Sequence, residues 1–233
     1  MAARDDEVTL RLVWPQWQGA GTSSVRELAS EFPFDAARRG YAVGAAVLAA
    51  ILPSHDGPVA VAPVAMGDDG LDLRDGIGTP ASEYPGFHAM AVAALTGHGD
   101  REVLELLPAT VDPGRVALAG LHAWAEDDIG NVAEWGIRAF APDDLRDGTR
   151  PLLEWLAATG CTKLAVHFDV DTVDSNEIVL GLGAEPDGLT SAQVRRIVSD
   201  LGAAGDVVGL TIAEFFPRQV MHLQRMLAGF PLL

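Results

Sequence analysis

Apolar segments of strand length alternate with helical segments along most of this chain of 233 residues. Strands are predicted at runs rich in Val, Leu, Ile and Ala, namely residues 8–15, 59–65, 116–124, 136–140, 163–171 and 207–215. Helices are predicted over residues 35–52, 87–95, 101–107, 143–159, 190–204 and 219–227, with a further one starting near Val25. Strands that alternate with helices form a parallel sheet covered on both faces. We therefore predict a single domain over residues 1–233, with a mainly parallel sheet in a three-layer α/β/α fold.

The charge balance excludes several classes of partner. Asp and Glu number 33 against 16 Lys and Arg, which gives a formal net charge of −17. Such a field repels nucleic acid and anionic lipid, and no cluster of Lys and Arg offsets it locally in the sequence. The longest apolar run, residues 41–53, is too short to span a bilayer, and Cys161 is the single cysteine, so no disulfide is expected. Because the N-terminus is charged, unlike a secretory signal, we expect a cytoplasmic protein without nucleic-acid or membrane partners.

The most informative strand, residues 163–171, ends in closely spaced aspartates. Asp169 and Asp171 are two positions apart, so their side chains lie on one face if the strand continues through both. Two converging carboxylates repel each other unless a cation lies between them, and Mn²⁺ or Mg²⁺ prefers such oxygen ligands. The alternative is an Asp-x-Asp that only ends the strand and caps the next loop. The following Asp174 favours the metal site, and we predict Asp169 and Asp171 as its ligands.

A second acidic residue occurs near the end of the strand predicted at residues 207–215. Glu214 has apolar neighbours and is followed by Pro217, which stops the strand. A carboxylate in such surroundings is expected to pair with a cation, and a guanidinium ligand suits it because the two groups bond bidentately. The alternative is a salt bridge to a framework arginine. In parallel sheets ligands bind outside the carboxyl ends of the strands, so Glu214, Asp169 and Asp171 are predicted to share one edge.

Two histidines are further candidates. His88 follows a turn and opens a predicted helix, where an imidazole that titrates near neutrality could shuttle protons. A purely structural role is the alternative for a histidine at the start of a helix. His167 shares a strand face with Asp169 and could add a metal ligand or pack beneath the site.

Several ordered motifs resemble those of the ureohydrolases, the family of arginase, agmatinase, guanidinobutyrase and formimidoylglutamase. His167-Phe-Asp-Val-Asp-Thr-Val-Asp174 resembles the family's Ser-Phe-Asp-x-Asp-x-x-Asp motif. Gly188-Leu-Thr190 is similar to its Gly-Gly-Leu-Thr segment, and Ile-Ala-Glu-Phe-Phe-Pro at 212–217 to its Glu-x-Asn-Pro strand end. Gly78-Thr-Pro80 and Gly86-Phe-His-Ala-Met90 resemble its Asn-Thr-Pro and Gly-Asn-x-His-Gly-Met-Pro stretch. The resemblance extends from about Gly78 to the C-terminus and is weaker over the first 60 residues.

This resemblance implies a manganese-dependent hydrolase of a guanidino or amidine C–N bond, which releases urea or a related amide plus an amine. Asp169 and Asp171 would bind a pair of Mn²⁺ ions, Glu214 would hold the guanidine or amidine end of the substrate, and His88 would be the proton shuttle. The implied fold is the arginase-like α/β/α arrangement, usually assembled into a homo-oligomer.

The chain also departs from the family pattern. The Gly-Gly-Asp-His and Asp-x-His-x-Asp metal motifs are not found, and the chain is short for the family, so we expect central elements, a strand–helix–strand block near residues 76–78, to be missing. His55, Asp56, Asp72 or Asp75 could supply substitute ligands. The resemblance implies two manganese ions, and without the missing motifs the alternatives are one ion or none. The alternative function is a catalytically impaired ureohydrolase-like protein that acts as a binding or assembly subunit. A nucleotide-binding fold fits less well, because the Gly-rich segments lack the phosphate-loop lysine and the third glycine of the dinucleotide motif.

Overall fold

The structure is a computed structural model that describes residues 59–64, 77–79, 81–82, 90–105, 107, 109–181, 184–215 and 219–233. The strands are β1 (Val59–Val64), β2 (Ala117–Ala119), β3 (Arg138–Phe140), β4 (Lys163–Asp169) and β5 (Asp206–Ala213). The helices are α3 (Ala91–Thr96), α4 (Arg101–Leu104), α5 (Ile129–Trp135), α6 (Pro142–Leu145), α7 (Arg150–Thr159), α8 (Ser191–Ala204) and α9 (Val220–Leu227), with 3₁₀ turns η3 (Pro113–Arg115) and η4 (Val170–Thr172). The strand and helices predicted within residues 8–52 lie outside the described residues.

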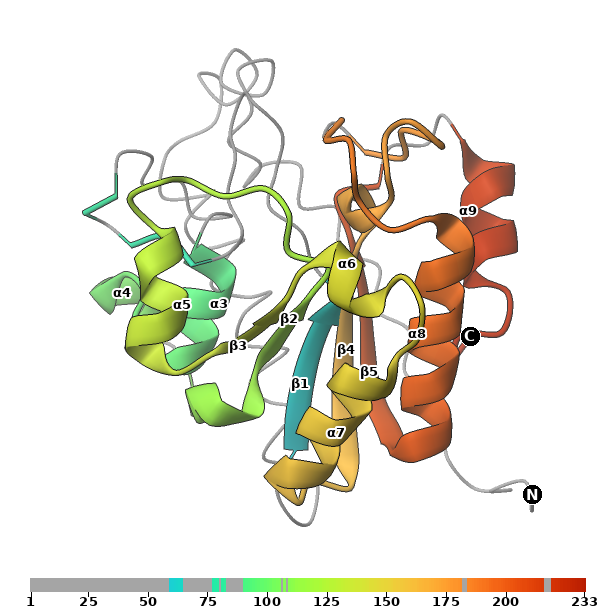
Figure 1. The fold of residues 1–233 in the computed structure, drawn as a ribbon. Coiled ribbons are helices and arrows are strands. Elements are labelled where there is room, and N and C mark those ends of the chain that lie inside the picture. The colour runs from blue at the N-terminus through green and yellow to red at the C-terminus, as the bar shows by residue number, and fades with distance from the viewer. Residues whose placement is uncertain are drawn as a thin grey trace.

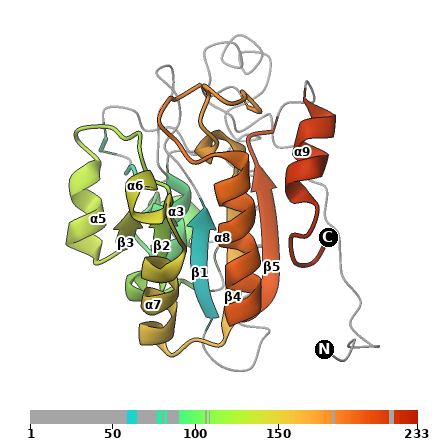
Figure 2. The same cartoon turned by 45° about the vertical axis from the view of Figure 1, so that its right-hand side comes forward.

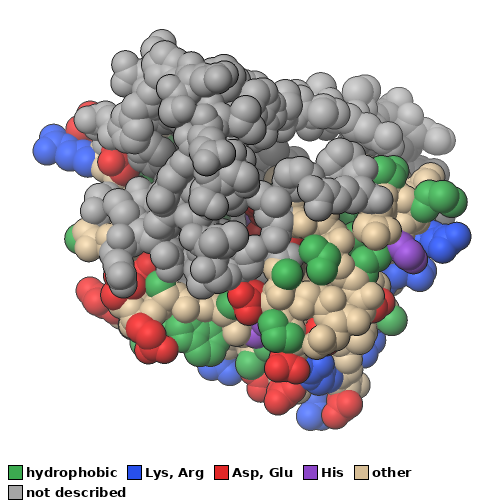
Figure 3. All heavy atoms as spheres, turned by 90° about the horizontal axis from the view of Figure 1, so that it is seen from above, with side chains coloured by type: hydrophobic (Ala, Val, Ile, Leu, Met, Phe, Trp, Pro, Cys, Tyr) green, Lys and Arg blue, Asp and Glu red, His purple; other side chains and the backbone are tan. Residues whose placement is uncertain are grey.

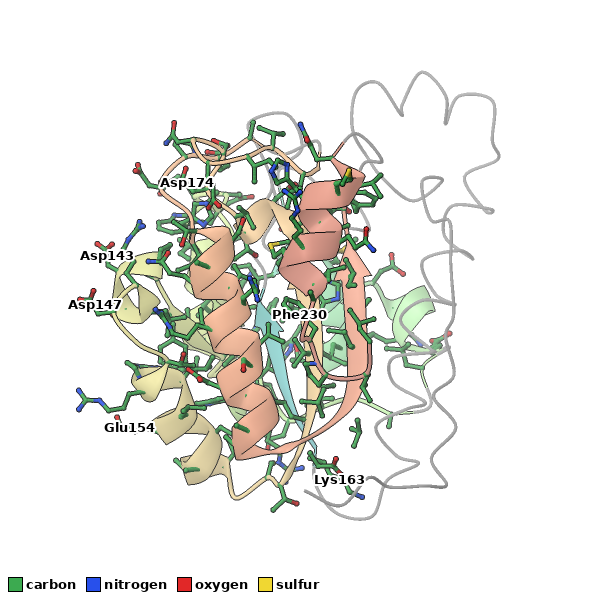
Figure 4. The ribbon with its side chains drawn as sticks, turned by 90° about the vertical axis from the view of Figure 1, so that its right-hand side faces the viewer. Asp143, Asp147, Glu154, Lys163, Asp174 and Phe230 are labelled. Atoms are coloured by element: carbon green, nitrogen blue, oxygen red, sulfur yellow. The ribbon has the colours of Figure 1, made fainter. Side chains whose placement is uncertain are left out.

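All strand pairs in the described part of the chain are parallel, as the alternation of strands and helices predicted. The order β1-β4-β5 makes one ladder and β2-β3 another, and β2 lies beside β1 (Figure 1). In register, Val64 of β1 pairs with Phe168 of β4, and Asp169 of β4 pairs with Ala213 of β5. The strands therefore end at one common edge, which is the upper edge in Figure 1. In Figure 4, Lys163 at the start of β4 and Asp174 beyond its end lie at opposite ends of the molecule.

Helices cover both faces of the sheet. Successive residues of β4 point to opposite faces, and each face packs in its own hydrophobic cluster. Leu164, Val166 and Phe168 pack in one cluster, which also contains the buried residues of α7, α8 and α9. Ala165 packs in the other cluster, with Val92 and other apolar residues of α3 and β2. Figure 2 shows α7 and α8 on the near side of the sheet. Burying each such Leu, Val or Phe side chain contributes about 1.5–3 kcal/mol, so the two clusters hold the layers together.

Helix α8 shows why the predicted elements form where the local signals are strong. Thr190 Oγ1 accepts a hydrogen bond from Gln193 N (3.3 Å), and Gln193 Oε1 accepts one from Thr190 N (2.7 Å). This reciprocal cap satisfies two backbone donors at the helix start. The buried residues recur at helical spacing and face the first cluster: Val194, Ile197, Val198 and Leu201. The prediction of a helix ending at Ala204 is confirmed.

Other predicted elements were too long or were missed. The strand predicted at 116–124 is only Ala117–Ala119, because Gly120 adopts φ +94° and turns the chain out of the sheet. The helix predicted at 143–159 is two helices, α6 and α7, and each has a proline in its first turn, where a missing N–H costs nothing. Helix α5 was not predicted. Within the described ranges, no helix has the length and apolar character needed to cross a membrane.

Candidate functional site

The candidate site lies at the edge where β4 and β5 end. Because Asp169 pairs with Ala213 across these parallel strands, Glu214 is the residue that follows the partner of Asp169. Asp171 is two residues beyond the end of β4, in the turn η4. The structure therefore brings Asp169, Asp171 and the backbone of Glu214 to the same edge of the sheet, as parallel strands require.

The prediction that Asp169 and Asp171 project from one strand face is wrong in its geometry. The strand ends at Asp169, and the chain then enters η4. Asp169 Oδ1 accepts a hydrogen bond from Asp171 N at 3.1 Å, so its side chain caps this turn. Short acidic side chains compete with strand pairing by bonding to nearby backbone N–H groups, and here the cap prevails. The alternative of an Asp-x-Asp that ends the strand and caps the loop thus describes the local structure.

Asp171 is nonetheless held tightly in the site. Its side chain is buried, with 5% of the residue exposed. A Cβ atom added to Gly181 would clash with Asp171 Oδ1 and would lie 2.7 Å from the backbone oxygen of Glu214. The backbone of Gly181 therefore packs directly against both acidic segments, and any larger residue would separate them. Gly181 was not predicted as part of the site, because its only signal in the sequence is a glycine in the loop after the aspartates.

The turn that carries Asp171 is fixed from the outside by the segment that resembles Gly-Gly-Leu-Thr. Leu189 N donates to Thr172 O at 3.0 Å, and Asp174 N donates to Leu189 O at 2.8 Å. Gly188 lies so close that an added Cβ would be 2.7 Å from Thr172 O. This motif, residues 188–190, therefore acts through its backbone. It pairs like a short strand with the chain at the end of η4 and is called the clamp.

Arg146, which follows α6, holds the clamp in place, and the sequence analysis missed it. Its guanidinium donates to the backbone oxygens of Asp187 (2.6 Å) and Gly188 (3.1 Å) and forms an ion pair with Asp143 at 2.7 Å. Arg196 of α8 in turn donates to the backbone oxygens of Leu145 and Arg146. These bonds link α6, α8 and the clamp into one polar network.

Glu214 differs from its predicted environment. The residue is exposed, so the argument that apolar neighbours desolvate its carboxylate does not apply. Its backbone has φ +60°, in the left-handed region that costs a residue with a side chain about 1–2 kcal/mol. Such strain persists only where the surroundings impose it, and it is concentrated at functional sites. The strand predicted to run to residue 215 ends at Ala213 because of this turn.

Of the two candidate histidines, the structure describes His167 and not His88. His88 lies outside the described residues, as do the possible substitute ligands His55, Asp56, Asp72 and Asp75. His167 lies on β4, where desolvation by burial lowers its pKa from 6.5 to about 4. A desolvated imidazole is uncharged at neutral pH, because burial disfavours the protonated form.

The described donors fit a divalent cation in kind but not in number. Asp169 and Asp171 offer the carboxylate oxygens that hard cations prefer. Within the described residues, however, no group of three or more His, Cys, Asp or Glu side chains is arranged to hold a metal ion. A manganese pair therefore does not fit these residues alone.

The comparisons with known proteins agree with this architecture. A family model described as the arginase family matches residues 72–228. Among solved structures, the arginase of Entamoeba histolytica in complex with L-ornithine superposes with a TM-score of 0.64 at 19% identity, over 76% of this chain and 60% of that one. The arginase of Bacillus subtilis gives a TM-score of 0.63 at 17% identity, over 84% and 79% of the two chains.

A related enzyme, the proclavaminate amidino hydrolase of Streptomyces clavuligerus, gives a TM-score of 0.53 at 17% identity, over 80% of this chain and 63% of that one. A comparison with curated protein sequences found no match. The chain spans about three fifths of the length of the Entamoeba arginase. The likeness confirms the predicted three-layer α/β/α fold with its parallel sheet. With the family match over most of its length, the chain belongs to the arginase family.

Proposed function

We propose that this protein is a hydrolase of a guanidino or amidine C–N bond, dependent on manganese, which releases urea or a related amide plus an amine. The observation that carries the proposal is the acidic edge: Asp169 ends β4, and Asp171 and Glu214 follow the neighbouring parallel strands β4 and β5, in a chain of the arginase family. The solved structures that resemble it include arginases and a protein named as an amidino hydrolase, and these names point to guanidino or amidine substrates.

In this proposal the exposed carboxylate of Glu214 receives the cationic end of the substrate. A guanidinium or amidinium group presents parallel N–H donors that match the two oxygens of a carboxylate. Asp171, buried beside Gly181, adds negative charge at a fixed position and keeps the cationic carbon near the edge. Water adds to that carbon, the C–N bond breaks, and the departing amine takes up a proton. His88 is the proposed proton shuttle for this transfer.

The test is turnover of a panel of arginine, agmatine, guanidino acids and formimidoyl glutamate, with urea, formamide and amine release measured with and without added manganese. We expect release with at least one substrate in the presence of manganese. E214Q and D171N should lower that rate by at least a hundredfold, because each removes a charge that the substrate needs. D147N is the matched control, since Asp147 is exposed and its side chain points outward from the molecule in Figure 4. No turnover of any substrate at saturating manganese would count against the proposal.

A second function has its own supporting observation. Asp169 is engaged as the cap of η4, and no cluster of three metal-binding side chains occurs in the described part of the chain. These facts favour a ureohydrolase-like binding or assembly subunit without catalysis, which we propose self-associates into a homo-oligomer. Calorimetry with manganese distinguishes the two functions, because two tight sites would contradict the non-catalytic one. Light scattering of the purified protein tests the homo-oligomer.

A further inference from the structure

A cavity of about 290 Å³ lies between α8, α9 and the loop that precedes α8. Arg195 of α8 and both His222 and Arg225 of α9 line it, opposite Glu177 and Leu180 of the loop. Figure 4 shows α8 and α9 side by side on this side of the molecule. The three basic side chains keep exposed surface, so a ligand can enter the cavity from solvent.

The cavity concentrates positive charge in an acidic protein. Within the described residues the ion pairs are Arg101–Glu105, Arg146–Asp143 and Arg150–Glu154. Neither Arg195 nor Arg225 takes part in an ion pair there, although the chain carries 33 acidic residues. Figure 3 shows Lys or Arg side chains and a His together at the right-hand edge, the side on which α9 lies in Figure 1. These basic residues form no cluster in the sequence, because they come from two separate helices.

The one acidic residue in the wall has a partner of its own. Glu177 Oε2 accepts a hydrogen bond from Ser191 N at 2.8 Å, at the first residue of α8. Its carboxylate therefore satisfies the start of the helix and does not neutralise the arginines in an ion pair. The two guanidinium groups remain available to an anion, and the helix start itself is already used.

We propose that this cavity binds a small multivalent oxyanion, of which a phosphate group is the best match. Guanidinium groups bind phosphate bidentately through their planar forks. Two arginines that approach from different helices suit a tetrahedral group, which offers oxygens in several directions, better than a planar carboxylate. The volume accommodates a phosphate group with a small substituent. This binding does not depend on the proposed hydrolase activity.

An anion bound in this cavity would contact the loop that also packs against the acidic edge. Leu180 lines the cavity, and the next residue, Gly181, packs against the Asp171 carboxylate and the backbone of Glu214. Glu177 lies in the same loop, and its N–H donates to Asp174 O at 2.9 Å. A ligand bridging the arginines and this loop therefore restrains the segment that supports Asp171.

The test is thermal unfolding and calorimetry of the full chain with inorganic phosphate, at constant ionic strength maintained with chloride. We expect phosphate to raise the Tm of the wild-type protein and to bind with a measurable Kd. R195Q and R225Q should each weaken binding roughly tenfold, the cost of one lost charge-assisted interaction. The matched control is R115Q, which removes the same charge outside the cavity and should bind like the wild type. Equal Tm values of all variants in chloride establish that they fold.

Two results would overturn the proposal: no phosphate-dependent shift beyond that in chloride, or an equal loss of binding in R115Q. A phosphate monoester in a second arm identifies the source of the group. Tighter binding of the monoester assigns the cavity to a phosphorylated metabolite, and tighter binding of phosphate assigns it to the free ion. Hydrogen exchange at the amides of Asp174 and Leu189 should slow on binding, and unchanged exchange would refute the link to the acidic edge.

Discussion

The ends of β4 and β5 lie side by side at the carboxyl edge of the sheet, yet they present their carboxylates in opposite ways. At the end of β4, Asp171 is buried, and its turn is fixed by backbone hydrogen bonds to Leu189. At the end of β5, Glu214 is exposed on a strained backbone. One acid is therefore held in place by packing from several segments, while the other is accessible to a ligand from solvent. Gly181 contacts both and is the point where the two ends meet.

The largest expected effect comes from placing a side chain at that meeting point. In G181A the new Cβ would clash with Asp171 Oδ1 and with the backbone oxygen of Glu214. Because a buried turn and a strand end must move apart, we expect the free energy of unfolding to fall by about 3 kcal/mol in urea denaturation. G148A is the control, since an added Cβ at Gly148 meets no atom within 4 Å. Equal stability of the two variants would show that the ends of β4 and β5 do not meet at Gly181.

Acidification is expected to lower the free energy of unfolding through His167 of β4. Its pKa is about 4 in the folded protein and 6.5 in the unfolded chain, so between these values only the unfolded chain takes up the proton. The stability contributed by the neutral imidazole is complete above pH 6.5 and is lost as the pH falls toward 4. Between pH 6.5 and 5 this loss is about 2 kcal/mol.

The measurement is denaturant unfolding at several pH values with a chelator present, so that metal binding does not contribute. H167N should lack this part of the pH dependence, because it has no group to titrate. If the wild type and H167N lose stability in parallel over this range, the imidazole is not desolvated in the folded protein.

The network behind the β4 turn is expected to give a smaller effect. R146Q removes the hydrogen bonds to the backbone oxygens of Asp187 and Gly188 and leaves these acceptors in need of water. We expect a loss of about 1.5 kcal/mol in unfolding free energy. R150Q serves as the control, because the ion pair of Arg150 with Glu154 is exposed and contributes at most a few tenths of a kcal/mol. A loss in R146Q no greater than that in R150Q would mean that Arg146 does not hold the clamp.

The smallest expected effect separates backbone strain from side-chain chemistry at the β5 end. Glycine adopts φ +60° without steric cost, whereas alanine does not, so E214G should be about 1 kcal/mol more stable than E214A. Both variants lack the carboxylate and should lose any guanidino hydrolysis equally. Thermal unfolding measures the first difference, and the turnover assay the second. Greater stability of E214A would contradict the strained backbone at this position.

Sequence patterns were reliable where the signals were local. The cap residues Thr190 and Gln193 and the apolar spacing that follows them predicted α8 to its last residue. The strand predicted at 163–171 was located correctly, but in the structure it ends two residues earlier, at Asp169. An aspartate such as Asp169 can either extend a strand or cap a turn, and the sequence does not distinguish the two. Gly181 and Arg146 were missed because their roles depend on partners elsewhere in the chain.

Local residue patterns were enough to predict the alternation of strands and helices, the acids at strand ends, and the resemblance to the ureohydrolases that the arginase-family match confirms. These properties follow from neighbouring residues, whose periodicity and caps act over a few positions. Three features became visible only in the folded chain: Asp171 is buried against Gly181, Glu214 is exposed on a strained backbone, and Arg195 and Arg225 line one cavity. Burial and electrostatic environment depend on which distant segments pack together, and a local pattern does not contain that information.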